Sequence, residues 1–379
     1  PCPYKRALAS TDKIKTALCV KPRASGHHSM GLIGGQQLSL VSWNLLAPAY
    51  ASPTKYSYAS RSDLSWPRRQ ARIVERLAEI DADVVCLQEV ETALWEELLG
   101  FMQSLGYDGV LQETSRGHPV ANAVCFRSGT LEVMRTESRS RALITVLRAR
   151  EAAVGASPAR SLARAPAPPL YLANLHLEAS ADKGAQRLAQ LRSLLRRLEL
   201  QAASDAAGGG HGQGRMSSDV VVDASNTPIV LAGDHNFDRS SELHTFLSTG
   251  EMPAGPDANG QRRPKTRRGQ ALLPLRDAYL KTPPPWGPKL RSSYRNGRIL
   301  DFVWTSDAVD VLRTMPVCEL AGSSQPHQLP SNDHPSDHLP VGALLSWPGA
   351  PASNPIERRP PWQRLFVESV VQRRPKRKP

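Results

Sequence analysis

The residues best suited to chemistry stand at the ends of short apolar segments, and they recur along the whole chain. They are amides, carboxylates and imidazoles, and no cysteine is among them. The positions are Asn44, Gln88, Glu89, Asn174, His176, Asp234, Asn236, Asp301, Asp337 and His338. Because ligands bind at strand ends in open α/β folds, these side chains can meet in one site. Oxygen donors with imidazole and without thiolate favour Mg²⁺, for which Mn²⁺ can substitute, over zinc.

Each of these positions also has an ordinary structural explanation. Gln88 with Glu89 can be a solvated turn, and Asp234 with Asn236 can form an Asx turn after Gly233. Asn-x-His and Ser-Asp-His sequences are common in surface turns and loops. These explanations do not account for the way in which every group borders an apolar segment, one after another.

Short apolar segments predict the strands that position these side chains. Strands are expected at 38–43, 84–87, 121–126, 131–134, 143–147, 170–175, 229–232, 299–304, 309–312 and 339–345. Helices are expected from about 65 to 80, where Ser65 can cap and Pro67 fits the first turn, from about 92 to 105, and around 188–198. Successive strands with intervening helices predict two packed sheets flanked by helices, an α/β sandwich.

Composition divides the chain into one large domain and two irregular ends. Residues 1–37 predict a basic N-terminal arm, 38–347 the domain, and 348–379 a basic, Pro-rich tail. Polar segments near 151–169, 203–218 and 252–270 predict flexible insertions in the domain. The tail is expected to be disordered or to serve as an import or RNA-contact segment. The first residue is Pro1, so we expect a fragment or a processed form.

Composition and charge exclude several classes of protein. The 379 residues include 48 Lys and Arg against 35 Asp and Glu, a net charge of +13, which favours an anionic partner such as nucleic acid, a phosphorylated small molecule or an acidic membrane surface. A hydrophobic content of 40% excludes a wholly disordered chain. No apolar run is long enough to span a membrane, and no secretory signal is visible. Five cysteines without a Cys-x-x-Cys pair argue against disulfides and structural zinc, which predicts an intracellular, cytoplasmic or nuclear location.

The strand-end segments, in order, resemble the motifs of the endonuclease/exonuclease/phosphatase superfamily. They are Ser-Trp-Asn-Leu-Leu-Ala at 42–47, Cys-Leu-Gln-Glu-Val-Glu at 86–91, Asn-Leu-His-Leu at 174–177, Ala-Gly-Asp-His-Asn-Phe at 232–237, Leu-Asp-Phe-Val-Trp at 300–304 and Pro-Ser-Asp-His-Leu-Pro at 335–340. Residues 56–72 and 329–330 are similar to the branch of carbon catabolite repressor type deadenylases, nocturnin, the angel proteins and the 2′,5′-phosphodiesterases. The resemblance covers residues 38–346 and implies a DNase I-like, four-layer α/β sandwich of two packed mixed β-sheets flanked by helices.

The resemblance also implies a Mg²⁺-dependent phosphoesterase site. Glu89 is then the principal metal ligand, assisted by Asn44, and Asp337 lies near the metal. Mg²⁺ neutralises the phosphodiester and can stabilise both the attacking and the leaving oxygen. Whether one or two metal ions take part is left open.

The same resemblance implies the roles of the other motif residues. Asp234 orients or deprotonates the attacking water, and Asn236 holds a phosphate oxygen. His176 lies near the scissile phosphate. His338 stabilises charge on the transition state, and Asp301 fixes its tautomer through a hydrogen bond, as in other Asp–His pairs.

Substrate contacts are expected from Asn174, from Asn236 and from three residues outside the motifs. Deadenylases carry an aromatic residue that stacks on adenine shortly before the Leu-Asp motif, and only Tyr294, displaced, is available here. Arg262 and Arg263 belong to a basic cluster that either contacts a nucleic-acid backbone or is simply solvated.

Two further departures from the deadenylase pattern concern recognition. Residues 120–122 read Val-Ala-Asn where an Asp-Gly pair is usual, and His235 stands where Phe is usual. His235 either packs like the aromatic residue or adds a titratable group.

The favoured function is a Mg²⁺-dependent 3′–5′ exoribonuclease of the poly(A)-deadenylase type that releases 5′-nucleotides. The second is a phosphatase or phosphodiesterase on a small nucleotide such as NADP or 2′,5′-oligoadenylate, and a third is a catalytically silent RNA-binding module. Phospholipid hydrolysis also occurs in the superfamily, but no apolar membrane-docking segment supports it. We expect RNA or another phosphorylated nucleotide as partner, no membrane, no leucine-rich repeat for docking to a deadenylase complex, and a monomer.

Overall fold

The computed structural model describes residues 37–114, 118–150, 168–206, 226–251, 273–282, 297–315 and 329–350. The predicted arm and tail and the predicted insertions at 151–169 and 252–270 lie almost wholly outside these residues. The proposed domain boundaries therefore stay predictions.

Two mixed sheets make up the centre of the fold, and the first has six strands in the order β11-β12-β1-β2-β4-β3. β1 and β2 run parallel, and the other neighbours pair antiparallel. The strands are β1 Leu38–Asn44, β2 Val84–Glu91, β3 Tyr107–Leu111, β4 Val120–Arg127, β11 Asp310–Thr314 and β12 Val341–Ser346.

The second sheet also has six strands, in the order β5-β6-β7-β8-β10-β9. Its one parallel pair among the described strands is β7 with β8. The strands are β5 Leu131–Arg139, β6 Ala142–Ala149, β7 Leu170–His176, β8 Ile229–Asp234, β9 Arg276–Asp277 and β10 Asp301–Thr305.

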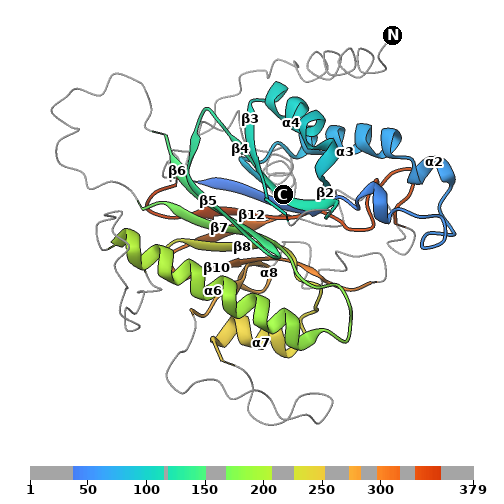
Figure 1. The fold of residues 1–379 in the computed structure, drawn as a ribbon. Coiled ribbons are helices and arrows are strands. Elements are labelled where there is room, and N and C mark those ends of the chain that lie inside the picture. The colour runs from blue at the N-terminus through green and yellow to red at the C-terminus, as the bar shows by residue number, and fades with distance from the viewer. Residues whose placement is uncertain are drawn as a thin grey trace, which may run out of the picture. The chain divides into compact units, whose positions relative to one another are not determined.

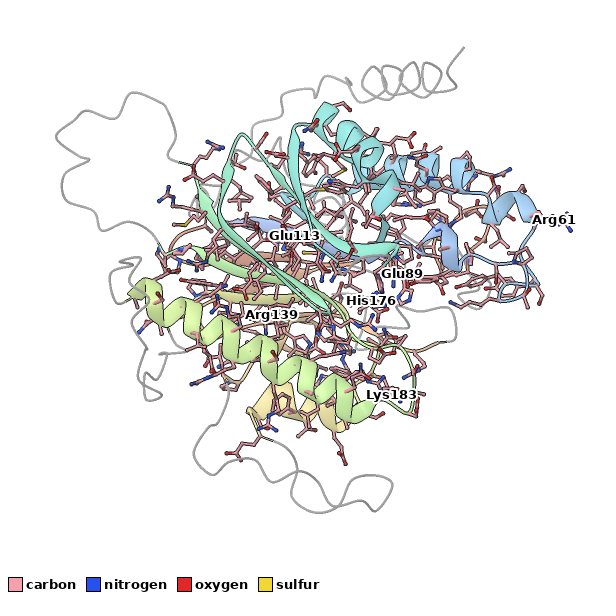
Figure 2. All side chains as sticks on the ribbon, viewed as in Figure 1. Arg61, Glu89, Glu113, Arg139, His176 and Lys183 are labelled. Carbon is pink, nitrogen blue, oxygen red and sulfur yellow. The ribbon has the colours of Figure 1, made fainter. Side chains whose placement is uncertain are left out.

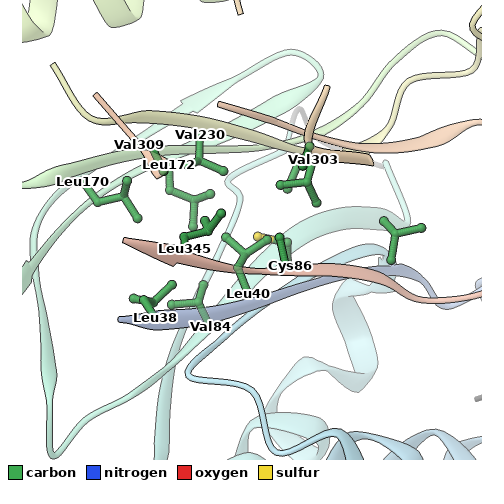
Figure 3. Packing of buried hydrophobic residues seen from close by; sticks show 14 of the residues in the cluster. Leu38, Leu40, Val84, Cys86, Leu170, Leu172, Val230, Val303, Val309 and Leu345 are labelled. Carbon is green, nitrogen blue, oxygen red and sulfur yellow. The ribbon is translucent and has the colours of Figure 1, made fainter. Parts of the chain in front are cut away.

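A buried apolar core lies between the two sheets (Figure 3). Leucine, valine and Cys86 side chains from β1 and β2 meet side chains from β7, β8 and β10. The contacts include Leu38, Leu40, Val84 and Cys86 from one sheet and Leu170, Leu172, Val230 and Val303 from the other. Each fully buried side chain of this kind contributes about 1.5–3 kcal/mol to folding.

Helices cover the outer faces of both sheets (Figure 1). On the first sheet lie α3 Trp66–Ile80 and α4 Trp95–Ser104, and on the second lie α6 Gly184–Ala206 and α7 Glu242–Thr249. The short elements are η1 Pro48–Tyr50, α2 Arg61–Leu64, η2 Thr92–Leu94 and α8 Ala278–Lys281. The order helix, sheet, sheet, helix confirms the predicted four-layer sandwich.

The helix α3 shows how the sequence specifies these outer layers. Ile73, Leu77 and Ile80 recur at helical spacing and are completely buried against the sheet. Pro67 occupies the first turn as predicted, but the Ser65 side chain makes no capping hydrogen bond. The helix ends at Asp81, which adopts a left-handed conformation with φ of 49°.

Some elements differ from the sequence prediction. The strand β3 and the helix α7 were not expected, and α6 extends to Ala206, so the first residues of the predicted 203–218 insertion are helical. The second strand runs on from Leu87 to Glu91 through an irregular pairing with β4. That irregularity positions one of the candidate site residues.

Candidate active site

Strand register brings the predicted residues of each sheet to adjacent positions. In the second sheet, Asp234 is paired with His176 across the parallel β7–β8 ladder and with Asp301 across the antiparallel β8–β10 ladder. In the first sheet, Asn44 at the end of β1 is paired with Gln88 of β2. Because side chains at paired positions point to the same face of a sheet, the three second-sheet residues form one group.

Glu89 stands on a β-bulge that redirects its side chain. The pairing of β2 with β4 shifts between Leu87 and Val90, and Glu89 has a φ of 55°. Bulges beside active sites commonly re-aim a side chain in this way, and left-handed backbone at a non-glycine residue is costly. The Ala47 N–H donates to Glu89 Oε2 at 3.0 Å, which fixes the carboxylate. Figure 2 shows Glu89 close to His176.

Asn44 connects the carboxylates of the two sheets. Its Nδ2 donates to Glu89 Oε1 and to Asp234 Oδ2, each at 3.2 Å. Its Oδ1 accepts the Leu46 N–H at 3.0 Å, and this bond selects the amide orientation. The amide nitrogen of Asn44 therefore faces both carboxylates and orients them, and its predicted role as a metal ligand stays a proposal.

His176 and His338 flank Asp234. The Nε2 of His176 lies 3.8 Å from Glu89 Oε1 and 3.6 Å from Asp234 Oδ2. The Nε2 of His338 lies 3.6 Å from the same Asp234 oxygen, and its Nδ1 lies 2.8 Å from Asp301 Oδ2. One ligand atom each from Asp234, Asp301 and His338 fall within 4.8 Å of one another, and all three residues are buried.

The two aspartates favour the cationic form of His338. Burial lowers the pKa of this imidazole, but the charges of Asp301 and Asp234 and the hydrogen bond that Nδ1–H donates to Asp301 raise it by more. The net effect is a pKa well above 6.5. His338 therefore carries a positive charge, and its Nε2–H lies on the side of the ring that faces Asp234.

Asn236 and Gly233 shape the loop that follows β8. Asn236 has a φ of 52°, and its backbone N–H donates to Asp234 Oδ1 at 2.9 Å. One N–H of its side-chain amide donates to Leu177 O at 3.0 Å, and the other has no hydrogen-bond partner among the described residues. Gly233 has a φ of 145°, and a Cβ there would lie 1.9 Å from Leu175 O. Only glycine fits this position, as the Gly-Asp motif suggests.

Asp337 is buried but lies outside the cluster of Asp234, Asp301 and His338. Its Oδ2 accepts the Tyr56 hydroxyl at 2.6 Å. The charge of Asp337 supports the cations of both Arg69 and His338. The structure thus places Asp337 in the electrostatic surroundings of the site, where its metal role stays a proposal.

Asn174 does not have the exposure that its predicted substrate contact requires. It is completely buried between the sheets, where its Nδ2 donates to Leu87 O and Ala123 O, both at 2.8 Å. Its Oδ1 accepts Gln88 Nε2 at 2.7 Å. All its hydrogen-bonding groups are used, so the side chain links the two sheets behind the site. Tyr294, Arg262 and Arg263 lie outside the described residues.

Sequence reasoning missed a buried arginine that joins two loops of the site. The guanidinium of Arg69 on α3 donates to Pro335 O and to Leu45 O, both at 2.6 Å, and to Leu46 O. Burial lowers its pKa to about 10, so it remains a cation at neutral pH. The sequence of the helix did not indicate that Arg69 is buried, because an arginine on a helix is usually exposed to solvent.

Ser336 adds a second link between the same loops. Its hydroxyl donates to Asn44 O at 2.6 Å and accepts the His338 N–H at 3.1 Å. The Trp43 Nε1–H donates to His338 O at 2.9 Å. The loop that carries His338 is therefore held against the end of β1 by side chains from both.

The structure also resolves the choice for His235. This side chain is completely buried, with its ring edge-on to Phe237 and Phe302 at 5.2–5.5 Å between centroids. Burial lowers its pKa to about 4. His235 is therefore a neutral packing residue and not a titrating group of the site.

A divalent cation suits the donor set at this point. Glu89 Oε1 and Asp234 Oδ2 approach the same Asn44 nitrogen from opposite sheets, and the His176 Nε2 lies within 4 Å of both. The buried Asp234 carboxylate and the partly buried Glu89 carboxylate converge here, and a positive charge between them stabilises both. Hard oxygen ligands fit Mg²⁺ or Mn²⁺.

In the described part of the chain, no helix is both long and apolar enough to cross a membrane.

Comparisons with known proteins identify the family and the fold. The endonuclease/exonuclease/phosphatase family matches residues 41–338. Protein angel homolog 2 of Mus musculus is 27% identical over 316 residues, which cover 81% of this chain and 52% of that protein. Carbon catabolite repressor protein 4 homolog 1 of Arabidopsis thaliana is 25% identical over 364 residues, which cover 81% of this chain and 56% of that protein. The chain spans about half the length of these curated relatives.

Two solved structures share the fold. ANGEL2, described as a 2′,3′-cyclic phosphatase, superposes with a TM-score of 0.61 at 20% identity, covering 83% of this chain and 96% of that one. The human nocturnin catalytic domain superposes with a TM-score of 0.53 at 20% identity, covering 82% of this chain and 93% of that one.

Proposed function

Because the chain belongs to the endonuclease/exonuclease/phosphatase family, we propose that it is a metal-dependent phosphoric ester hydrolase that acts on RNA or another phosphorylated nucleotide. The observation that carries this proposal is the convergence of Glu89 from one sheet with Asp234 and His338 from the other. The Asn44 amide spans the two carboxylates, and His338 lies 3.6 Å from Asp234. A carboxylate to hold a cation, a second carboxylate to act as base and an imidazolium to stabilise charge are together suited to phosphodiester hydrolysis.

Glu89 is the main candidate for holding the metal. Asp337 is a further acidic residue of the site, and its negative charge can contribute to metal binding. When bound there, Mg²⁺ would supply Lewis-acid stabilisation of the phosphoryl oxygens. The Asn44 amide and the Ala47 N–H keep the Glu89 carboxylate in place. Loss of either hydrogen bond would change the orientation of the Glu89 carboxylate, while the packing of the apolar core would stay the same.

Asp234 and Asn236 act on the attacking side. Asp234 accepts a proton from the water as the new P–O bond forms. The Asn236 N–H holds its Oδ1, and the Asn44 amide orients its Oδ2, which has a lone pair left for this task. The remaining amide N–H of Asn236 donates to a phosphate oxygen. His176, between Glu89 and Asp234, lies beside the same phosphate.

His338 and Asp301 act on the developing charge. The His338 cation donates from Nε2 to an oxygen that gains negative charge as the P–O bond breaks. Asp301 accepts from Nδ1 at 2.8 Å, which fixes the tautomer and the ring orientation.

Among possible substrates, we favour RNA attacked from its 3′ end with release of 5′-nucleotides, as in deadenylases. A net charge of +13 supports a polyanionic substrate. The second candidate is a small nucleotide ester such as NADP, 2′,5′-oligoadenylate or a 2′,3′-cyclic phosphate. The activity named for ANGEL2 favours this alternative, because a cyclic ester needs the same water attack at phosphorus.

A substrate panel tests the proposal. Purified protein is incubated with poly(A), mixed RNA, RNA ending in a 2′,3′-cyclic phosphate, 2′,5′-oligoadenylate and NADP, each with Mg²⁺ and with EDTA. We expect P–O hydrolysis of at least one substrate with Mg²⁺ and none with EDTA. Failure on every substrate, or hydrolysis that EDTA leaves unchanged, would contradict the proposal.

A further inference from the structure

An exposed tyrosine stands on the turn that holds Glu89. Tyr50, the last residue of η1, is 37% exposed, which is unusual for a large hydrophobic side chain in the described residues. Its N–H donates to Ala47 O at 2.9 Å, and its carbonyl accepts the Ser52 N–H at 3.1 Å. The turn fixes the backbone of Tyr50 on both sides, so its ring is presented from a rigid position.

Tyr50 is one tight turn away from the proposed metal ligand. The Ala47 N–H donates to Glu89 Oε2, while the Ala47 carbonyl accepts the Tyr50 N–H. The pKa of the Tyr50 phenol is raised by partial burial and by the charge of Glu89, and the charge of Arg141 partly opposes this. The phenol therefore lies in the fields of both a site carboxylate and an arginine.

Arg141 lies beside His176, in the connection between β5 and β6. Its carbonyl accepts the His176 N–H at 3.0 Å, so its backbone is fixed to a site residue. Its side chain is 31% exposed, and Nη2 donates to Glu178 Oε2 at 2.6 Å. A guanidinium has five N–H donors, and among the described residues Glu178 is the one recorded partner of this side chain.

An aromatic ring beside Glu89 and an arginine beside His176 match the two parts of a nucleotide, its base and its phosphate. Bases stack on exposed aromatic side chains regardless of sequence, and arginine binds phosphate through paired N–H groups. Tyr50 stands on the turn whose Ala47 N–H donates to Glu89, and the Arg141 carbonyl accepts the His176 N–H, so the backbone of both residues is tied to the site.

We propose that Tyr50 and Arg141 form a nucleotide subsite beside the hydrolytic centre, in which the tyrosine ring stacks on a base and the guanidinium binds a neighbouring phosphate. The subsite rests on the proposed function, because it presupposes a nucleotide substrate. The aromatic ring of this subsite follows the end of β1. The adenine-stacking aromatic residue of deadenylases stands elsewhere, shortly before the Leu-Asp motif.

The binding test uses a short RNA that carries 2-aminopurine, titrated in EDTA so that hydrolysis is suppressed. Stacking on Tyr50 quenches the fluorescence of the base analogue. Tyr50→Ala should abolish the quenching and weaken binding by about 5- to 100-fold, and Tyr50→Phe, which keeps the ring, should stay within about twofold of wild type. Met134→Ala removes another exposed large side chain, on β5, and should change neither quantity.

Arg141→Gln tests the phosphate half of the subsite. It should weaken binding and lower the slope of log Kd against log salt by about one, because one counterion fewer is released. Arg148→Gln is the matched control, since Arg148 also pairs with a glutamate but lies on β6 outside the site. An unchanged slope in Arg141→Gln would overturn the phosphate contact.

The outcomes separate this subsite from the proposed function. Quenching that survives Tyr50→Ala in a protein that hydrolyses RNA overturns the subsite alone. Quenching that is lost in Tyr50→Ala, from a wild type that hydrolyses nothing in the substrate panel, supports the subsite and overturns the proposed function. A wild type that neither binds nor hydrolyses overturns both.

Discussion

Replacing His235 by Phe should make the folded protein less sensitive to acid. The imidazole is completely buried beside Phe237 and Phe302, and its Nδ1 contacts Gly233 O at 2.9 Å. Its Nε2 has no hydrogen-bond partner among the described residues. Phenylalanine fits the same aromatic surroundings without that unsatisfied nitrogen, so at neutral pH the two proteins should differ by about 1 kcal/mol or less.

The size of the acid effect follows from the pKa of His235. This pKa is lowered from 6.5 to about 4 in the folded protein, because burial disfavours the cation. Below the unfolded value the unfolded chain binds a proton that the folded chain does not, so stability falls as the pH falls. The wild type should therefore lose about 2 kcal/mol relative to His235→Phe between about pH 7.5 and about pH 5.

Urea unfolding of the two proteins at a series of pH values measures this difference. Other titrating groups, including His334, whose pKa burial also lowers to about 4, are common to both proteins and cancel. We expect the stability difference to stay constant above pH 7, at about 1 kcal/mol or less, and to grow as the pH falls below about 6.5. Parallel stability curves down to pH 5 would show that His235 is not a buried neutral group.

The remaining predictions concern the site and its supports. Asp301→Asn removes a charge that raises the pKa of His338, so the alkaline limb of the pH–rate profile should move to lower pH; superimposable limbs would show that Asp301 does not tune the imidazole. Gly233→Ala would place a Cβ 1.9 Å from Leu175 O and should lower the free energy of unfolding by more than about 3 kcal/mol, measured by urea unfolding. Arg69→Met should lower kcat and destabilise the protein by about 3 kcal/mol because it leaves three buried carbonyls without their donor, and circular dichroism on heating checks this.

Apolar segments predicted the strands of both sheets well because a strand that is covered on both faces has few polar positions. The strand β3 escaped prediction for the opposite reason: Tyr107–Leu111 is an edge strand with one buried residue and four that are half-buried or exposed. The helix α7 did carry a signal, since Ser241 caps it and Leu243, Phe246 and Leu247 recur at helical spacing. Its brevity concealed that pattern.

The polar residues at strand ends predicted most members of the candidate site, but they did not predict how far each side chain is buried. Asn174 and His176 are two apart on β7 and so point to the same face. His176 reaches the open end, whereas Asn174 is covered by Leu87 and Ala123 of the facing sheet. The packing of one sheet on the other decides this difference, and the sequence of a single strand does not contain it.

The conformation of Glu89 was likewise beyond sequence reasoning. Its position after an apolar segment predicted a ligand, but the bulge that turns its carboxylate toward Asn44 depends on the pairing with β4. The Arg69 contacts depend in the same way on two loops that are distant from each other in sequence. Motif positions are local properties of the chain, and these contacts are not.

The central claim is that Glu89 makes this protein a metal-dependent hydrolase. The most direct test is the rate of phosphodiester hydrolysis as Mg²⁺ is titrated, for the wild type, for Glu89→Gln and for the control Glu132→Gln, whose carboxylate pairs with Arg148 on the second sheet. We predict saturable activation of the wild type and the control, and a rate at least about 100-fold lower for Glu89→Gln at every Mg²⁺ concentration. Full activity of Glu89→Gln with an unchanged Mg²⁺ dependence would contradict the claim.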